Sequence, residues 1–274
     1  MAVTMADITH LRKMTGAGMM DCKNALTEAN GDYDKAMEII RKKGQAVAAK
    51  REDREASEGC CLAAANGDFA AVVALKCETD FVAKNADFIA LTQSILDAAL
   101  KNKPTNIDEL NALSVDGSTV ANLITDRVGV TGEKMELGAY EFVKAPTTVA
   151  YIHPGNKLAT VVGFNLSNID VQVAKDVAMQ VAAMNPIAVS KEEVPAEIAA
   201  KELKIAKEKA IEAGKPEAIL DKIAEGALNK YFQENTLLSQ AFVKDSKISI
   251  DQYLKQQNKE LTVAGFKRVT LNVD

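Results

Sequence analysis

The sequence has 274 residues, of which 47% are hydrophobic and 26% charged, and its formal net charge at pH 7 is −5. This length suits about two domains with cores of their own, and the composition is that of a folded, soluble protein. The negative charge argues against nucleic acid as the main target and no apolar run reaches the roughly 18 residues of a membrane span, so we expect a cytoplasmic protein that binds neither nucleic acid nor membranes.

Residues 1–45 predict a module of three short helices. Apolar residues recur there at helical spacing, and Gly16-Ala17-Gly18, Asn30-Gly31 and Gly44 end the three segments. A core this small is marginal by itself, which suggests a recognition module. Met19 and Met20 are sequence neighbours that cannot both face one core. Either one of them is a core residue and the other an incidental surface residue, or the pair offers an adaptable apolar contact to a partner.

Residues 46–57 combine strong helix formers with charges of both signs. This pattern predicts a solvated helical linker and places a domain boundary there.

From Gly59 onward the apolar pattern becomes that of strands. Segments 60–65 and 69–76 flank the hairpin turn Asn66-Gly67-Asp68, and they are followed by a helix over 86–101 and a third strand over 134–142. These elements define core lobe N, residues 58–144.

The following residues repeat this plan, with strands over 147–153 and 157–166, a helix from Val171 and a last strand within 261–273. They define core lobe C, residues 145–186 and 234–274. The sequence thus predicts an α+β fold, with a two-lobed core of antiparallel sheets backed by helices.

Residues 187–233 interrupt the second lobe. They predict a helical hairpin, with helices over 196–213 and 217–232 and a narrow seam rich in alanine. The seam can close within the hairpin or receive a second copy or a partner.

Thr79-Asp80-Phe81-Val82 lie where the apolar strand ends and the helix over 86–101 follows. One interpretation is structural: Thr79 or Asp80 caps a helix and Phe81 packs under its first turn. The other is that Asp80 and Phe81 protrude as a charged and apolar probe of another protein. His153 lies beside the turn Pro154-Gly155, where it either binds a partner or is simply solvated, and Phe242 with Val243 belong to a short apolar cluster.

No motif for catalysis, nucleotide binding or metal binding is present. The four cysteines have no CxxC spacing and only two histidines accompany them, so we expect buried free thiols. A cysteine-dependent enzyme is one alternative function, and a helical recognition module that binds some other protein through Met19 and Met20 is another.

Two segments carry a resemblance to a known family. The segment Leu11-Arg12-Lys13-Met14-Thr15-Gly16-Ala17-Gly18-Met19-Met20-Asp21-Cys22-Lys23-Asn24-Ala25-Leu26 and the segment Glu78-Thr79-Asp80-Phe81-Val82-Ala83-Lys84 resemble the two signatures of bacterial elongation factor Ts. The resemblance extends over essentially the whole chain. It implies a UBA-like N-terminal module, a coiled-coil-like hairpin, and a protein that is no enzyme and needs no cofactor or metal. The implied function is guanine nucleotide exchange on elongation factor Tu in translation elongation.

The resemblance also implies roles for particular residues. Asp80 and Phe81, with Thr79 and Val82, would wedge into the GTPase domain of Tu near its Mg²⁺ site. Arg12, Met19, Met20 and Lys23 would touch the same domain, His153 would touch a different domain, and Phe242 and Val243 would add a further contact. A homodimer or a 2:2 complex through the helical hairpin is a further expectation.

The sequence departs from the family pattern in two places. Lys76 stands where the signature usually has Asn, and the chain ends at Asp274 without the C-terminal helical module of longer members. We therefore expect affinity for Tu to rest more heavily on the N-terminal module.

Overall fold

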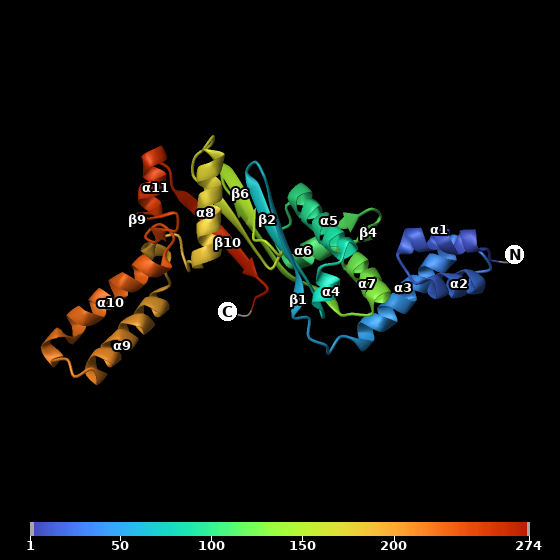
Figure 1. Cartoon of the computed structure of the whole chain (residues 1–274), viewed down its shortest axis with the longest axis horizontal. Coiled ribbons are helices and arrows are strands. Elements are labelled where there is room, and N and C mark those ends of the chain that lie inside the picture. The colour runs from blue at the N-terminus through green and yellow to red at the C-terminus, as the bar shows by residue number, and fades with distance from the viewer. Residues whose placement is uncertain (1–2, 273–274) are drawn as a thin grey trace.

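The computed structural model describes residues 3–272. The molecule is elongated, with the N-terminal helices at one end, two sheets in the middle and a helical hairpin at the other end (Figure 1). No helix in residues 3–272 is long and apolar enough to cross a membrane.

Three helices form the N-terminal module: α1 (Met5–Thr15), α2 (Met19–Glu28) and α3 (Tyr33–Lys50). Thr4 caps α1 in a reciprocal capping box with Asp7, and Gly16 ends it in a left-handed conformation that glycine adopts without strain. Leu11, Cys22 and Leu26 are completely buried at the centre of the module. The three predicted helices are therefore present.

The third helix does not end where the sequence pattern predicts. Helix α3 continues through Gly44 to Lys50, and a turn over residues 51–54 follows, so the predicted linker is helical over residues 46–50 and not over residues 51–57. The reason is tertiary packing: Val47 and Ala48 lie against the core of the first lobe, which stabilises the helix beyond the glycine.

The first lobe is a three-stranded antiparallel sheet in the order β1-β2-β5, covered by helices on one face. Phe69, Phe88 and Ile95 are buried between the sheet and α5. The elements of this lobe are β1 (Glu58–Asn66), β2 (Phe69–Cys77), α4 (Asp80–Ala83), α5 (Ala86–Asn102), α6 (Ile107–Ala112), β3 (Ser114–Val115), β4 (Ser118–Thr119), α7 (Val120–Thr131) and β5 (Met135–Lys144).

The second lobe repeats this plan with the sheet order β10-β7-β6 and α8 on its outer face. Its last strand comes from the C-terminal end of the chain, as the sequence predicts. The elements are β6 (Thr147–Ile152), β7 (Leu158–Phe164), α8 (Val171–Met184), β8 (Ala241–Phe242), β9 (Asp245–Ser249), α11 (Ile250–Gln257) and β10 (Val263–Thr270).

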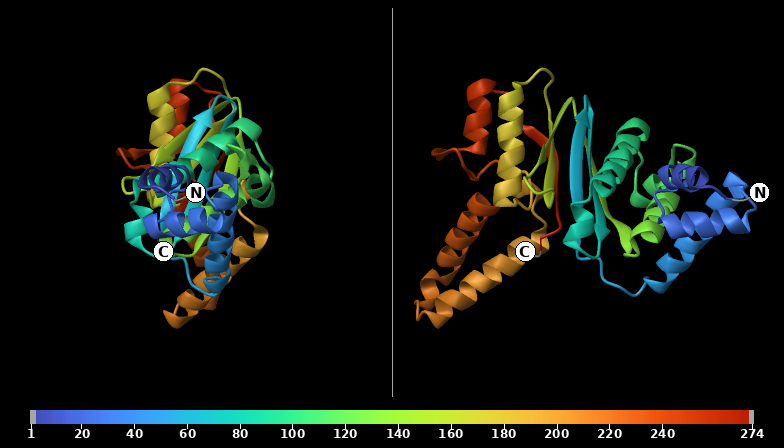
Figure 2. Two further views of the ribbon diagram at one scale, coloured as in Figure 1. Left: turned by 90° about the vertical axis from the view of Figure 1, so that its right-hand side faces the viewer. Right: turned by 45° about the vertical axis from the view of Figure 1, so that its right-hand side comes forward.

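The two sheets pack face to face, with α5 and α8 on the outer faces (Figures 1 and 2). The interface consists mainly of small residues, including Ala63, Ala70, Ala74 and Ala159, and a Cβ on Gly163 would lie 2.6 Å from Val143. Adjacent Cys60 and Cys61 face opposite sides of β1, one toward α5 and one toward the second sheet. The small side chains let the two lobes pack into one body.

The inserted segment forms the predicted hairpin from α9 (Ala196–Glu212) and α10 (Leu220–Asn235), with short 3₁₀ turns at Lys191–Glu193 and Glu217–Ile219. Ala210, Leu220 and Ala224 are buried between the helices, so the alanine-rich seam is at least partly closed within the hairpin. The hairpin projects away from the sheets (Figure 2).

Candidate partner-binding site

The corner between β2 and α5 projects an aromatic side chain into solvent. Thr79 is the N-cap of the single helical turn α4, its Oγ1 accepting a hydrogen bond from the Val82 N–H at 3.4 Å. Phe81 follows Asp80 on this turn and is 85% exposed, more than any other large hydrophobic side chain in residues 3–272. Phe81 therefore does not pack under the first turn of a helix, and the structural interpretation of this residue is wrong.

The corner is anchored on both sides by carboxylates. Glu133, between α7 and β5, accepts hydrogen bonds from the Thr79 N–H at 3.1 Å and from its hydroxyl at 2.6 Å. Glu78 accepts one from the Lys134 N–H at 2.6 Å and pairs with Arg51 at 3.2 Å. Bonds to charged acceptors are the stronger class, so these anchors hold the backbone of the corner in one conformation.

Val82 and Ala83 also pack into the core of the first lobe, directly after the exposed Phe81. The chain thus leaves the core after Cys77 and returns to it at Val82. Phe81 is a rigidly mounted side chain, whereas an exposed aromatic on a long loop would be mobile.

Asp80 forms an ion pair with Lys84, one helical turn later, at 2.6 Å. The hydrogen bond from Lys84 holds the pKa of the Asp80 carboxyl below its usual 3.8, with a weaker contribution from Lys157, so the group is a carboxylate at neutral pH. The Lys84 side chain is 76% exposed and the Asp80 side chain 47% exposed. A partner can therefore approach the carboxylate directly.

Arg12, Met19, Met20 and Lys23 are all exposed on the N-terminal module. Met19 and Met20 are 42% and 64% exposed, while Cys22 and Leu26 form the buried side of α2. The alternative in which one of the two methionines is a core residue is therefore wrong. Lys23 lies one turn after both methionines, so these three side chains are neighbours on the surface of α2.

His153 is exposed where β6 ends, with Nδ1 3.0 Å from the Tyr151 hydroxyl. Its turn lies at the same end of the core as the Asp80 corner: Asn156 accepts a hydrogen bond from the Cys61 N–H at 2.7 Å, and Lys157 pairs with Glu58 at the start of β1. The structure thus brings two of the predicted contact regions to one edge.

Phe242 and Val243 differ in exposure. The Phe242 ring is buried and stacks on Tyr253 with the ring centroids 4.3 Å apart, whereas Val243 is 48% exposed. Phe242 is thus a core residue of the second lobe, and Val243 is the side chain of this pair that a partner can reach.

The four cysteines lie in the interior of the protein. All four are buried, and burial raises the pKa of the thiol to about 11 for Cys60 and about 12 for Cys61 and Cys77. Within residues 3–272, no group of three or more His, Cys, Asp or Glu side chains could hold a metal ion. The alternative of a cysteine-dependent enzyme has no structural support.

Sequence reasoning missed the anchors of the corner. Lys84 could have been found, because it lies four residues after Asp80 on a helical turn. Glu133 and Arg51 contact the corner from 54 and 27 residues away, and no pattern in the sequence pairs them with it.

Comparisons with known proteins agree with the arrangement of these residues. The family described as "Elongation factor TS" matches residues 78–272, more than half of the chain. Elongation factor Ts of Porphyromonas gingivalis is 66% identical over 275 residues, covering 100% of both chains. The proteins of the same name from Azobacteroides pseudotrichonymphae and Bacteroides thetaiotaomicron are 62% and 48% identical, again with 100% of both chains covered. The chain therefore belongs to the elongation factor Ts family, the non-catalytic nucleotide exchange factors of elongation factor Tu in translation elongation.

Proposed function

We propose that this chain releases GDP from Tu by placing the Phe81 ring and the Asp80 carboxylate against the Mg²⁺ side of the nucleotide site, while the N-terminal module holds the same GTPase domain. The observation that carries this proposal is the 85% exposure of Phe81 on an otherwise anchored corner. The hydrogen bond from the Val82 N–H to the Thr79 hydroxyl and the packing of Val82 on the core of the first lobe fix the direction in which the ring projects.

The physical basis is linkage. An exchange factor leaves the GDP/GTP equilibrium unchanged; it binds the nucleotide-free state of the GTPase better than the nucleotide-bound state, and nucleotide and factor then weaken each other reciprocally. Mg²⁺ is often the largest local charge that holds a phosphate, so a competing carboxylate and an inserted ring near it act on the strongest element of the site.

The contribution of Phe81 can be estimated. Burying a phenylalanine side chain stabilises a complex by about 1.5–3 kcal/mol, and each 1.4 kcal/mol corresponds to a factor of ten in rate or affinity. Phe81→Ala should therefore slow GDP release by about 10- to 100-fold. Because the ring makes little contact with its own chain, the free energy of unfolding should change by less than about 0.5 kcal/mol.

The experiment measures release of fluorescent GDP from purified Tu at saturating concentrations of the variant. Val171→Ala is the matched control, since Val171 is 67% exposed at the start of α8 in the other lobe. Release at the wild-type rate by Phe81→Ala would show that the corner is not the probe.

Three further contacts belong to the same proposal. Arg12, Met19, Met20 and Lys23 grip the GTPase domain, and His153 and Val243 touch other parts of Tu, with Phe242 supporting Val243 from the core. Contacts of this kind contribute equally to binding of nucleotide-bound Tu and of the state of Tu that releases GDP. Met20→Ala should therefore raise the concentration of factor needed for half-maximal exchange and leave the saturated rate unchanged.

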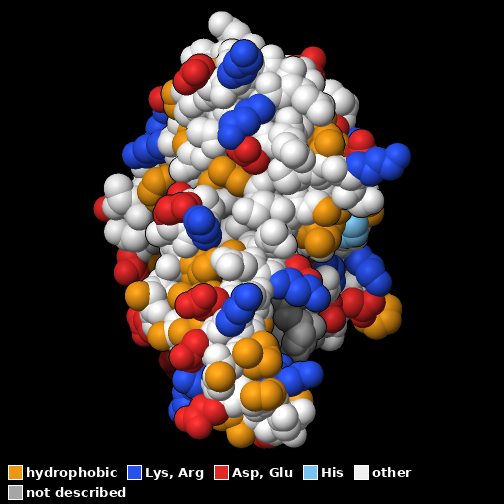
Figure 3. Space-filling view, turned by 90° about the vertical axis from the view of Figure 1, so that its left-hand side faces the viewer, with side chains coloured by type: hydrophobic (Ala, Val, Ile, Leu, Met, Phe, Trp, Pro, Cys, Tyr) orange, Lys and Arg blue, Asp and Glu red, His pale blue; other side chains and the backbone are white. Residues whose placement is uncertain are grey.

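We also propose that the hairpin joins two Tu complexes into a 2:2 assembly. A groove of about 460 Å³ runs along α9 and α10, lined by apolar side chains such as Ile205, Ile223 and Tyr231. Figure 3, viewed from the hairpin side, shows apolar side chains gathered low on this face, among charges of both signs. Ala227→Glu in the groove should convert a 2:2 complex to 1:1 in sedimentation; wild-type complex that sediments as 1:1 contradicts the proposal.

A further inference from the structure

Helices α3 and α7 cross at two glycines. A Cβ on Gly129 would lie 2.6 Å from the Cα of Gly44, and one on Gly44 would lie 3.3 Å from the Thr125 carbonyl oxygen. Both distances are shorter than ordinary van der Waals contact, so the two backbones touch directly. Gly44 is buried within the helix that begins in the N-terminal module.

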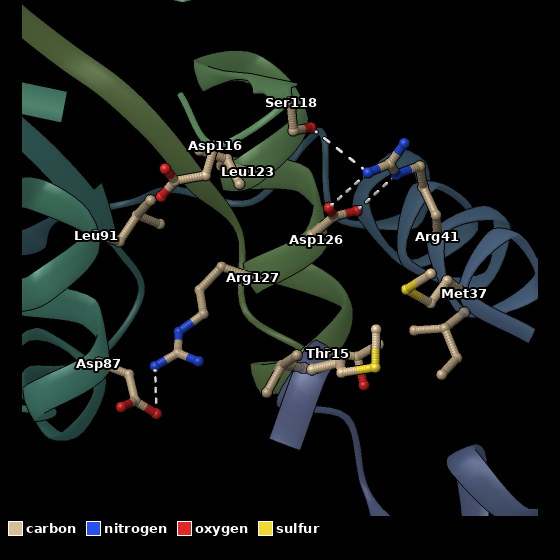
Figure 4. Close-up of a pocket in the computed structure, with 13 residues that line it drawn as sticks. Thr15, Met37, Arg41, Asp87, Leu91, Asp116, Ser118, Leu123, Asp126 and Arg127 are labelled. Carbon is tan, nitrogen blue, oxygen red and sulfur yellow. Dashed lines mark hydrogen bonds and ion pairs between the residues drawn. The ribbon is translucent and has the colours of Figure 1, made fainter. Parts of the chain in front are cut away.

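One ion pair beside this crossing joins α3 to α7, and a second one lies within the first lobe. Arg41 of α3 pairs with Asp126 of α7 at 3.5 Å, and Arg127 pairs with Asp87 at the start of α5 at 2.9 Å (Figure 4). They line a pocket of about 430 Å³ between the module and the first lobe. The module also approaches α7 at Gly16, where a Cβ would lie 3.7 Å from Arg127 and 3.8 Å from Val130, so the glycine crossing is the closer of these two approaches.

The same two helices end at the corner that carries Phe81. Arg51, the residue that ends α3, bonds to Glu78, and Glu133 follows α7 and bonds to Thr79. The helix pair therefore runs from the module, through the glycine crossing, to the anchors of the corner.

We propose that Gly44 and Gly129 are positioning residues for exchange: their contact fixes the distance and orientation between the face of the module (Arg12, Met19, Met20 and Lys23) and the Asp80-Phe81 corner. Both regions then engage one GTPase domain at the same time. This inference rests on the proposed function of the two regions. When two contact sites are held at the right spacing, binding of the second becomes intramolecular, and the gain is lost if the geometry changes.

A methyl group added at the crossing would push the two helices apart, and this displacement would grow with distance along α3. The Cβ that Gly129→Ala introduces needs about 1 Å more space than the present 2.6 Å, because carbon atoms pack at roughly 3.5–4 Å. Helix α3 begins at Tyr33, 11 residues before Gly44, which is about 16 Å along the helix at 1.5 Å per residue. Local separation of the helices therefore becomes a larger displacement of α1 and α2.

The chain supplies a graded series of glycine-to-alanine variants. Gly226 lies inside α10 with nothing within 4 Å of an added Cβ, so Gly226→Ala is the control for helix propensity. Gly44→Ala is the mild member, with its closest contact at 3.3 Å, and Gly129→Ala is the severe one. Each is assayed for GDP release from Tu over a range of factor concentrations.

A distance measurement accompanies the kinetics. Spin labels on cysteines introduced at exposed Glu28 in α2 and Lys101 in α5 report the spacing between module and lobe, because the native cysteines are buried. We expect Gly129→Ala to change or broaden this distance and to raise the half-maximal factor concentration about tenfold, with the saturated release rate within about twofold of wild type. Gly44→Ala should show smaller changes in both readouts and Gly226→Ala none.

The outcomes separate this inference from the proposed function. If Phe81→Ala slows release but Gly129→Ala and Gly44→Ala exchange like Gly226→Ala, the corner acts as proposed and the positioning role is refuted. An unchanged distance with weakened exchange also refutes it. If Gly129→Ala does not fold, Gly44→Ala decides by the same two readouts.

Discussion

Replacing Glu133 by alanine tests whether the corner must be rigid in order to act. The side chain of Glu133 accepts two hydrogen bonds, both from Thr79, at 3.1 and 2.6 Å. Its removal leaves the Thr79 N–H without its partner and loosens the N-cap of α4. Phe81 itself stays unchanged, so any effect on exchange arises from the loss of anchoring.

The size of the effect follows from the bonds lost. A hydrogen bond to a charged group contributes about 1.5–3 kcal/mol, and the half-buried position of Glu133 places the pair of bonds near about 2 kcal/mol in total. If that free energy holds the corner in its binding shape, its loss reduces the second-order rate of GDP release by about 30-fold, at about 1.4 kcal/mol per factor of ten.

The assay compares fluorescent-GDP release with the free energy of unfolding in urea for three variants. Glu133→Gln keeps one carbonyl acceptor and should recover part of the lost rate. Glu136→Ala removes a nearby half-exposed carboxylate that pairs with Lys76 and Lys134 at 3.7 and 3.4 Å and does not bond to Thr79, and it should exchange as wild type. Equal release rates for Glu133→Ala and Glu136→Ala would refute the argument that the anchor prepares the probe.

Two further predictions concern buried groups. Burial raises the pKa of Asp176, but hydrogen bonds from Lys244, Gln172 and Tyr253 outweigh it and hold the pKa below the usual 3.8. The carboxylate therefore stabilises the fold above pH 3.8, and this contribution is lost as pH falls through the folded-state pKa. In urea titrations, the difference in free energy of unfolding between wild type and Asp176→Asn should be largest at about pH 6 and become smaller below about pH 4. A difference that does not change with pH would contradict the assignment. All four thiols are buried, and burial raises the pKa of Cys60 to about 11, so a thiol-alkylating reagent should leave exchange by the native chain unchanged. Mass spectrometry should show that the reagent modifies the four cysteines only in denaturant.

The strand and helix plan of the core was predictable because it is local. The turns Asn66-Gly67-Asp68 and Pro154-Gly155 mark both hairpins, and the change from strand to helix period marks α5 and α8. The long separation between β7 and β10 was also recoverable, since the second lobe lacks a third strand until the C-terminal end.

What the sequence could not supply was contact between distant segments. A glycine in a helical pattern normally predicts an end, and the pattern predicts one at Gly44; the true role of this glycine depends on Gly129, 85 residues later, whose backbone it touches. Phe242 and Val243 are adjacent apolar residues in the sequence, and only the folded structure shows that the ring of Phe242 stacks on Tyr253 in the core of the second lobe.

The anchoring of the corner has an energetic reason. Fixing the backbone of one residue costs about 1–2 kcal/mol, so a mobile corner of the four residues Thr79 to Val82 would lose several kcal/mol on binding, more than the roughly 1.5–3 kcal/mol that burial of one phenylalanine contributes. The bonds from Glu133 and Glu78 and the packing of Val82 remove that cost while the chain folds. Exposure and rigidity together therefore distinguish Phe81 from an incidental surface aromatic, and weakening either one should weaken exchange.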